Sequence, residues 1–341
     1  MPVPGWDGEV GRLTFGIEQE QFAFRVDGTP PTRDDCLAVL EALMARGFSP
    51  GARDEHGELV TVSRDTPTGP LTLKHDFCSH IVEVSYPPAR HVGEFAAQYE
   101  ETQALVRAVL ATRTIRLRPG GALARMPAKP LFRPSDSDKT WARILNYLNR
   151  PVPRRPFSHR LFFAGMCATQ IHLNILSPDF YARLPLLYGV EHLVPLLYSV
   201  SPVFNGRGAH CVRPLMYRDG FSEAYRTNTI PRPIPRTAEA YAALRAASRG
   251  FLRDYCFIAP SRHGTVEFRA ACSQPTVEDI IELLALRVAI VVGVWRGYWP
   301  ERPNAERLFW DACLTGDVPL RILEEDDATL AQAMLELPDD L

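Results

Sequence analysis

The sequence predicts an α+β fold, organised as a single domain over residues 1–341 with an antiparallel sheet. Short segments rich in β-branched and aromatic residues recur along the chain, and helical patterns fill the long gaps between them. This arrangement favours an antiparallel sheet with packed helices. Hydrophobic residues make up 46% of the chain and charged residues 23%, the balance of a packed globular protein. We place the core at 12–295 and a C-terminal helical segment at 296–341.

The first half of the chain alternates between strand and helix patterns. Residues 12–26 read as a strand, and Asp34 and Asp35 can begin a helix that runs to about Arg46, where Gly47 ends it. Pro87 and Pro88 stop the strand before them. Strands are further predicted at 59–64, 71–74, 81–86 and 114–118, and a long helix at 92–112.

The second half contains the strongest helix pattern, at 276–292, and a segment rich in Pro, Gly and Arg at 201–236, which is typical of a functional loop. Strands are predicted at 161–175 and 264–270, helices at 139–149, 184–200 and 241–254, a loop at 150–156, and a last helix in the acidic tail beyond Pro319.

Charge and composition exclude several classes of protein. The net charge of -2 gives no broad electrostatic case for binding nucleic acid or a membrane surface. The most apolar stretch, 280–294, contains Glu282 and Arg287, so we expect a buried helix there and no membrane span. Seven scattered cysteines without a CxxC pair indicate neither disulfides nor a zinc cluster, and we expect a reducing cytoplasm.

Two pairs of carboxylates stand out on predicted strands. Glu18 and Glu20 project from one face because the side-chain period of a strand is two. A hard divalent metal would offset their repulsion, although a solvated strand face also explains them. Asp76 enters the strand at 81–86, and Glu83 lies within its apolar run, facing either solvent or a polar cleft.

Two later strands carry polar residues on one face. Gln170, His172 and Asn174 alternate with aliphatic residues, which fits either the floor of a polar cleft or an amphipathic edge strand. Glu267 and Arg269 share a face, as a salt bridge or as a metal ligand beside a phosphate-binding guanidinium. Arg207 and Arg213 belong to the Gly-punctuated segment after Ser201, which is either a binding loop or solvated surface and matches no P-loop or Rossmann motif.

Together these motifs resemble the glutamate–cysteine ligase family, in particular the type 2 bacterial carboxylate–amine ligases. The resemblance covers about residues 12–295. It rests on the order of five motifs: Gly-Ile-Glu-x-Glu at 16–20, the pair Asp76 and Glu83, His172 on its alternating strand, Ser-Pro-x-x-x-Gly at 201–206, and Glu-x-Arg at 267–269 before a long apolar helix.

The resemblance implies a glutamine-synthetase-like fold, with a curved antiparallel sheet and helices on the outside. It also implies that ATP phosphorylates a carboxylate and that an amine then displaces phosphate, with Mg²⁺ (or Mn²⁺) as cofactor. Glu20, Asp76 and Glu83 would hold one metal ion. Glu18, His172 and Glu267 would hold a second, with Arg269 on the transferred phosphoryl group. Arg213 or Arg207 would contact the substrate carboxylate.

Two departures from the family pattern bear on the substrate. Gln170 stands where family members often have a first histidine, and Ala271 to Ser273 replace a segment that usually holds an Asp. Both are expected near substrate or nucleotide, so a specialised biosynthetic ligase acting on a modified amino acid or a peptide is one hypothesis. The alternatives are a kinase of small carboxylates or guanidino compounds, a non-catalytic nucleotide-binding homologue, and a metal-dependent hydrolase.

Overall fold

A computed structural model describes residues 13–54, 56–128, 154–159, 161–220, 229–247, 256–261 and 263–337. The helix expected at 139–149 lies outside these residues, as does the end of the helix expected at 241–254.

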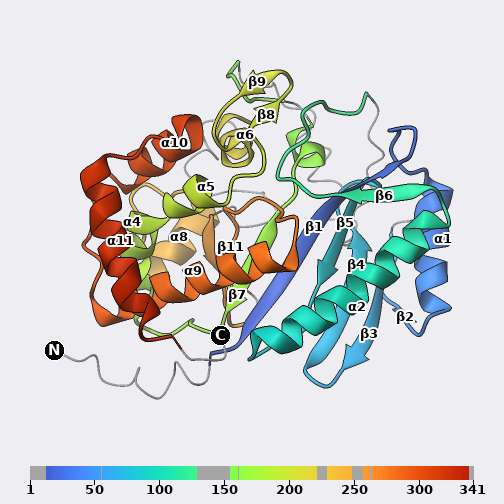
Figure 1. Ribbon diagram of the computed structural model, residues 1–341, viewed down its shortest axis with the longest axis horizontal. Helices are drawn as coiled ribbons and strands as arrows, with labels where there is room; N and C mark the ends of the chain where they lie inside the picture. Colours follow the sequence, from blue (N-terminus) through green and yellow to red (C-terminus); the bar gives the residue numbers. More distant parts are fainter. Residues whose placement is uncertain are drawn as a thin grey trace.

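The predicted antiparallel sheet is confirmed, with nine strands in the order β10-β11-β7-β1-β5-β4-β3-β2 and β6 pairing with β1 (Figure 1). All of its strand pairs are antiparallel. The strands are β1 (Phe15–Arg25), β2 (Ser49–Pro50), β3 (Thr61–Thr66), β4 (Gly69–His75), β5 (Ile81–Ser85), β6 (Ile115–Arg118), β7 (Thr169–Leu173), β10 (Ile258–Pro260) and β11 (Val266–Phe268).

Strand β1 is the central element, because it has neighbours along both edges. β5 pairs with one edge, and β7 and then β6 pair with the other. One face of β1 is apolar: Phe15 and Ile17 are almost fully buried. The side-chain period of two therefore sends Glu18 and Glu20 to the opposite face.

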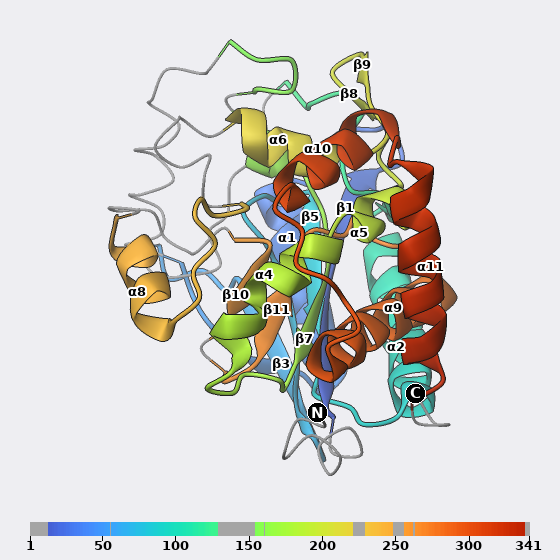
Figure 2. The same ribbon diagram turned by 90° about the vertical axis from the view of Figure 1, so that its left-hand side faces the viewer.

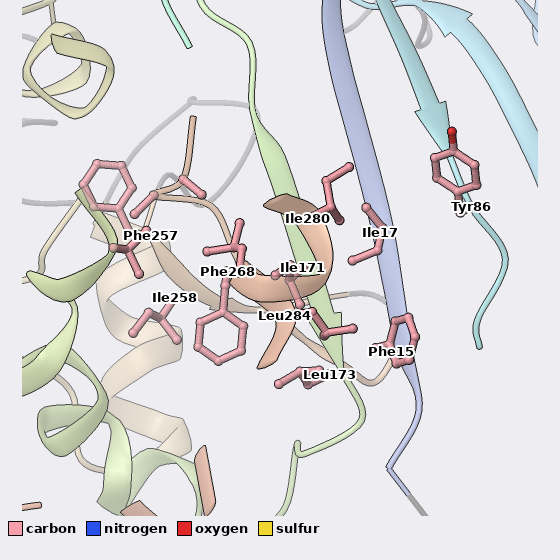
Figure 3. Packing of buried hydrophobic residues seen from close by; sticks show 14 of the residues in the cluster. Phe15, Ile17, Tyr86, Ile171, Leu173, Phe257, Ile258, Phe268, Ile280 and Leu284 are labelled. Atoms are coloured by element: carbon pink, nitrogen blue, oxygen red, sulfur yellow. The ribbon is translucent and has the colours of Figure 1, made fainter. Parts of the chain in front are cut away.

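The helices of the described residues are α1 (Arg33–Met44), α2 (Val92–Ala111), α4 (Phe180–Val190), α5 (Leu193–Leu197), α6 (Val212–Gly220), α8 (Ala238–Ala247), α9 (Val277–Arg296), α10 (Ala305–Thr315) and α11 (Leu320–Met334). Two of them cover the apolar face of the sheet. Phe95 of α2 makes an edge contact with Phe15, with 6.1 Å between ring centroids. Ile280 and Leu284 of α9 lie over Ile17 and its neighbours on β7 (Figure 3).

The C-terminal segment is helical, as the sequence predicts. Helix α11 packs on α9, and α10 packs on α4, α5 and α6 (Figure 2). Buried polar contacts hold α11 in place: Asp326 accepts hydrogen bonds from Arg302 and pairs with His192 at 2.9 Å. These contacts join the segment to the core of the molecule.

Three expected elements differ from the structure. The strand at 161–175 is shorter, because Phe162–Gly165 form a 3₁₀ helix (η2) before β7 begins. A Cβ at Gly165 would lie 2.4 Å from Met126 Sδ, so a larger residue there would force the Met126 side chain to move. The helix at 184–200 is two helices, α4 and α5, with a break at Glu191 and His192, both of which use their side chains in buried ion pairs. The loop at 201–236 contains α6 and a small hairpin of β8 (Val203–Phe204) and β9 (Arg207–Gly208).

No helix in the described part of the chain is long and apolar enough to cross a bilayer. All seven cysteines are buried, and none is joined to another in a disulfide.

Candidate active site

The polar face of the sheet collects side chains from five strands at matching positions. Antiparallel register pairs Glu20 with Glu83, and Glu83 with Lys74. The same register pairs His172 with Glu267 on the other side of β1. Residues paired across neighbouring strands share a face, so these side chains gather over the centre of the sheet.

The first group of possible metal ligands consists of Glu18, His172 and Glu267. One ligand atom from each lies within 4.8 Å of the others. His172 Nε2 is buried and, among the described residues, has no hydrogen-bond partner, while Glu18 Oε1 is 3.5 Å away. An imidazole nitrogen and two carboxylates are a donor set that suits a divalent cation.

Thr265 fixes the orientation of the His172 ring. Nδ1 shares a hydrogen bond of 3.1 Å with Thr265 Oγ1, which in turn bonds Ser261 Oγ at 2.7 Å. When Nδ1 carries the proton and donates it to Thr265, the Nε2 lone pair points at the carboxylates. Burial alone would disfavour a charged ring, but Glu18 and Glu267 outweigh burial and raise the pKa of His172. This nitrogen and its anionic surroundings fit a bound cation.

The second group consists of Glu20, Asp76 and Glu83, again with ligand atoms within 4.8 Å of one another. Burial, reinforced by Asp76, raises the pKa of Glu20 to about 7. Burial also raises the pKa of Glu83 well above its ordinary value, although Lys74 opposes the shift. Lys74 Nζ lies 3.0 Å from Glu83 Oε2 and 3.5 Å from Asp76 Oδ1. This group therefore already contains a positive charge.

Asp76 enters the second group through a strained turn. Its backbone amide donates to the Ile81 carbonyl, and Phe77, the next residue, has a φ of 55°. A bulky residue rarely adopts this left-handed conformation, which costs on the order of 1–3 kcal/mol and is found most often at functional sites.

Arg269 lies beside the first group. Its guanidinium donates two hydrogen bonds to the two carboxylate oxygens of Glu267, each at 2.5 Å. Arg213 is almost fully buried, donates to the Arg269 carbonyl at 2.6 Å and lies over the Tyr217 ring. Arg213 therefore supports Arg269 from behind, and it is not among the residues that line the neighbouring pocket.

A pocket with a cavity volume of about 40 Å³ opens to solvent next to these residues. One part of its wall is polar and the other is aromatic. Phe77 and Phe163 stack with ring centroids 5.8 Å apart, and Tyr217 makes an edge contact with Phe257. The pocket is lined by Glu20, Asp76, Phe77, Phe163, Gln170, Tyr217, Phe257 and Arg269.

The structure brings together the six expected metal ligands, together with Arg269 and Gln170. Gln170 donates to Glu20 Oε1 at 2.9 Å. Arg207 lies on the exposed β8–β9 hairpin and is not among the residues that line the pocket. Ser273 is buried and bonds Gln19 and the Glu20 carbonyl, so it supports β1 from within, and it is not among the residues that line the pocket.

Sequence reasoning missed Lys74, Thr265 and the aromatic wall. Lys74 was detectable, because it lies two residues before Asp76 at strand spacing and can share its side of the sheet. The aromatic wall was not, because Phe77, Phe163, Tyr217 and Phe257 come from separate segments that only the fold brings together.

Comparison with known proteins gives the fold. Neither protein-family models nor curated proteins matched the chain. Among solved structures, a bifunctional glutathione synthetase from Pasteurella multocida matches with a TM-score of 0.58 and 14% identity, over 97% of this chain and 47% of that chain. A glutamate–cysteine ligase from Francisella tularensis in complex with AMP matches with a TM-score of 0.52 and 12% identity, over 95% of this chain and 80% of that chain.

At these identities the likeness shows a shared fold, the α+β fold of glutamate–cysteine ligase-like proteins. The chain spans less than half the length of the bifunctional glutathione synthetase that it matches.

Proposed function

We propose that this protein is an ATP-dependent carboxylate–amine ligase, similar to the type 2 glutamate–cysteine ligases, that forms an amide through an acyl phosphate. The observation that carries the proposal is the position of two carboxylate-rich groups and Arg269 on one face of a sheet, beside a pocket. Phosphoryl transfer needs positive charge held rigidly around phosphate oxygens, and strands position ligands more precisely than loops. The shared fold with two ligase structures, one of them bound to AMP, supports the proposal.

Glu18, His172 and Glu267 are proposed to hold Mg²⁺ or Mn²⁺, which would supply neutralising charge at the phosphate oxygens of ATP. Arg269 then turns from Glu267 toward the transferred phosphoryl group, where negative charge develops in the transition state. Arg213 positions Arg269 through its carbonyl. The sequence also predicts a metal ion at Glu20, Asp76 and Glu83, where the structure adds Lys74.

The pocket is proposed to receive the acid substrate. Gln170 and Arg269 offer donors to a carboxylate, and the aromatic wall contacts an apolar part of the substrate or the nucleotide base. The substrates are amino acids or a peptide, and a specialised biosynthetic substrate fits the departures at Gln170 and Ala271 to Ser273. The whole chain, with its C-terminal helices docked on the core, acts as one catalytic unit with a glutamine-synthetase-like arrangement of helices outside a curved sheet.

A small-molecule kinase would use the same metal and phosphate contacts but would release a phosphorylated product. The two activities separate in one experiment. ADP release is measured with ATP and Mg²⁺ over a panel of acids, starting with glutamate, each with and without amines that include cysteine. The ligase requires both acid and amine. Release with an acid alone identifies the kinase, and no release over the whole panel favours the non-catalytic homologue.

Two substitutions test the site assignment. Glu267→Gln and Glu20→Gln each remove a charge from one carboxylate group while keeping side-chain size, so we expect ATP-dependent product formation to fall by at least about 100-fold in each. Circular dichroism and the melting temperature check that the fold is intact. Turnover retained in both folded variants would overturn the assignment.

A further inference from the structure

The second carboxylate group contains a cation supplied by the chain itself. Lys74 is the direct neighbour of Glu83 across the β4–β5 pair, and Glu83 is the direct neighbour of Glu20 across the β5–β1 pair. The register of the strands therefore fixes the backbone of Lys74 directly beside the group. Its side chain is 15% exposed, beside a Glu83 side chain that is 3% exposed.

The ammonium group lies between two of the three carboxylates. It is 3.0 Å from Glu83 and 3.5 Å from Asp76. A Mg²⁺ or Mn²⁺ ion held by the same two carboxylates would need oxygens at about 2.0–2.2 Å and would lie within a few ångströms of the ammonium. Two cations at that separation in a buried site repel strongly.

Donors from the protein also satisfy the oxygens of this group. Both oxygens of Glu20 and both oxygens of Glu83 accept hydrogen bonds or pair with a cation at 2.8 to 3.1 Å. The four donors are the Ala168 amide, the Gln170 side chain, the Lys74 ammonium and the Ser85 hydroxyl.

The first group, Glu18, His172 and Glu267, differs from the second in the hydrogen bonding of one ligand atom. His172 Nε2 is buried beside two carboxylates and has no hydrogen-bond partner among the described residues. Arg269 donates to both carboxylate oxygens of Glu267, from one side of the group. An unsatisfied buried nitrogen costs free energy that a bound cation removes.

We propose that the Lys74 ammonium takes the place of a divalent cation in the Glu20, Asp76 and Glu83 group, so that the chain binds a single divalent cation, through Glu18, His172 and Glu267. The proposal rests on the metal-dependent function proposed above and specifies its metal content. The fixed ammonium would balance carboxylate charge at that end of the pocket without exchange with solvent ions.

The test is a count of bound Mn²⁺ in the purified chain without nucleotide, from the loss of the electron paramagnetic resonance signal of free Mn²⁺. Wild type is expected to bind one Mn²⁺. Lys74→Met, which keeps length and removes charge, is expected to bind two, and Lys74→Arg to keep one. Thr72→Val, two residues away on the same strand, is the matched control and should also keep one.

A second substitution locates the added ion. Glu83→Gln should leave the single Mn²⁺ of the wild type in place but return the Lys74→Met variant from two ions to one. Melting temperatures confirm that each variant is folded. Two Mn²⁺ of comparable affinity in the wild type, or one in folded Lys74→Met, overturns the inference while leaving a metal-dependent ligase intact. If neither the wild type nor Lys74→Met binds Mn²⁺, both this inference and the proposed metal-dependent ligase are overturned.

Discussion

At the scale of single residues, the site depends on side chains that hold other side chains in place. His172 can present Nε2 to Glu18 and Glu267 only in one ring orientation, which the hydrogen bond between Nδ1 and Thr265 Oγ1 supports. Arg213 acts in the same way on Arg269, because its guanidinium donates a hydrogen bond to the Arg269 carbonyl. Such supporting contacts commonly change metal affinity as much as a ligand does.

Thr265→Val removes the hydroxyl and keeps the shape of the side chain. We expect the affinity for Mn²⁺ to fall by about 10- to 100-fold, because the His172 ring loses the partner of Nδ1. A Mn²⁺ titration measures the effect, and Thr66→Val, on β3, serves as a control that should not change affinity. Equal affinity in wild type and a folded Thr265→Val would show that the hydroxyl does not orient the ring.

At the scale of elements, ion pairs join α1 to the sheet and α9 to α4. Asp35, in the first turn of α1, accepts from the Thr32 amide and pairs with Arg25 of β1 and Arg113 after α2. Glu191, at the end of α4, forms a bidentate pair with Arg287 of α9 at 2.5 and 2.7 Å, and both side chains are 1% exposed. These pairs orient α1 and α9 with respect to the strands of the site.

The Asp35 contacts predict a pH dependence of stability. Burial works to raise the pKa of Asp35, but bonds from Thr32 and the two arginines outweigh it and hold the pKa below its ordinary value of 3.8. Because the folded-state pKa is the lower one, the charge stabilises the fold above pH 3.8 and its contribution is lost as pH falls through the folded-state value.

Asp35→Asn keeps a capping oxygen and removes the charge. We expect it to lower the free energy of unfolding by on the order of 1–3 kcal/mol at neutral pH, and by progressively less as the pH falls below 3.8 toward the folded-state pKa, where the wild type also loses the contribution of the charge. Urea unfolding over a series of pH values measures the difference. A cost that does not change with pH would contradict a role for the charge.

The pair of Glu191 and Arg287 predicts a larger effect. Arg287→Met leaves a buried carboxylate without its partner, so the free energy of unfolding should fall by about 3–5 kcal/mol. The double variant Glu191→Met with Arg287→Met removes both charges and should recover most of that loss. A single variant as stable as the wild type, measured by urea unfolding, would mean that the buried pair contributes nothing to α9 packing.

At the scale of the whole molecule, the sequence predicts the sheet and the ligand groups better than the residues that line the pocket beside them. Glu18, Glu20 and Glu267 follow from strand periodicity, and the family resemblance sorts them into the two groups that the structure brings together. Periodicity cannot show which strands are neighbours, so the pairing of Lys74 with Glu83 needed the register of the sheet. Short elements such as η2 and the β8–β9 hairpin depend on tertiary contacts and were missed.

The C-terminal helices also show that local patterns do not predict tertiary contacts. The sequence predicts a helical segment at 296–341, but its docking depends on Asp326 meeting Arg302 and His192, which no local pattern reveals. The apolar face of α9 is predicted from its spacing, and the structure shows that strands of the sheet on one side and α11 on another make that helix the centre of the core.

In the proposed reaction, a substrate carboxylate attacks the γ-phosphate of ATP and an amine then displaces the phosphate. Labelling both carboxylate oxygens of the acid with ¹⁸O tests this, in a reaction with ATP, Mg²⁺ and the amine that supports turnover. We expect one ¹⁸O atom to be transferred to each molecule of inorganic phosphate and the other to be retained in the amide. Inorganic phosphate released without ¹⁸O during amide formation would contradict the acyl phosphate, because the carboxylate oxygen would never have been bonded to the γ-phosphorus.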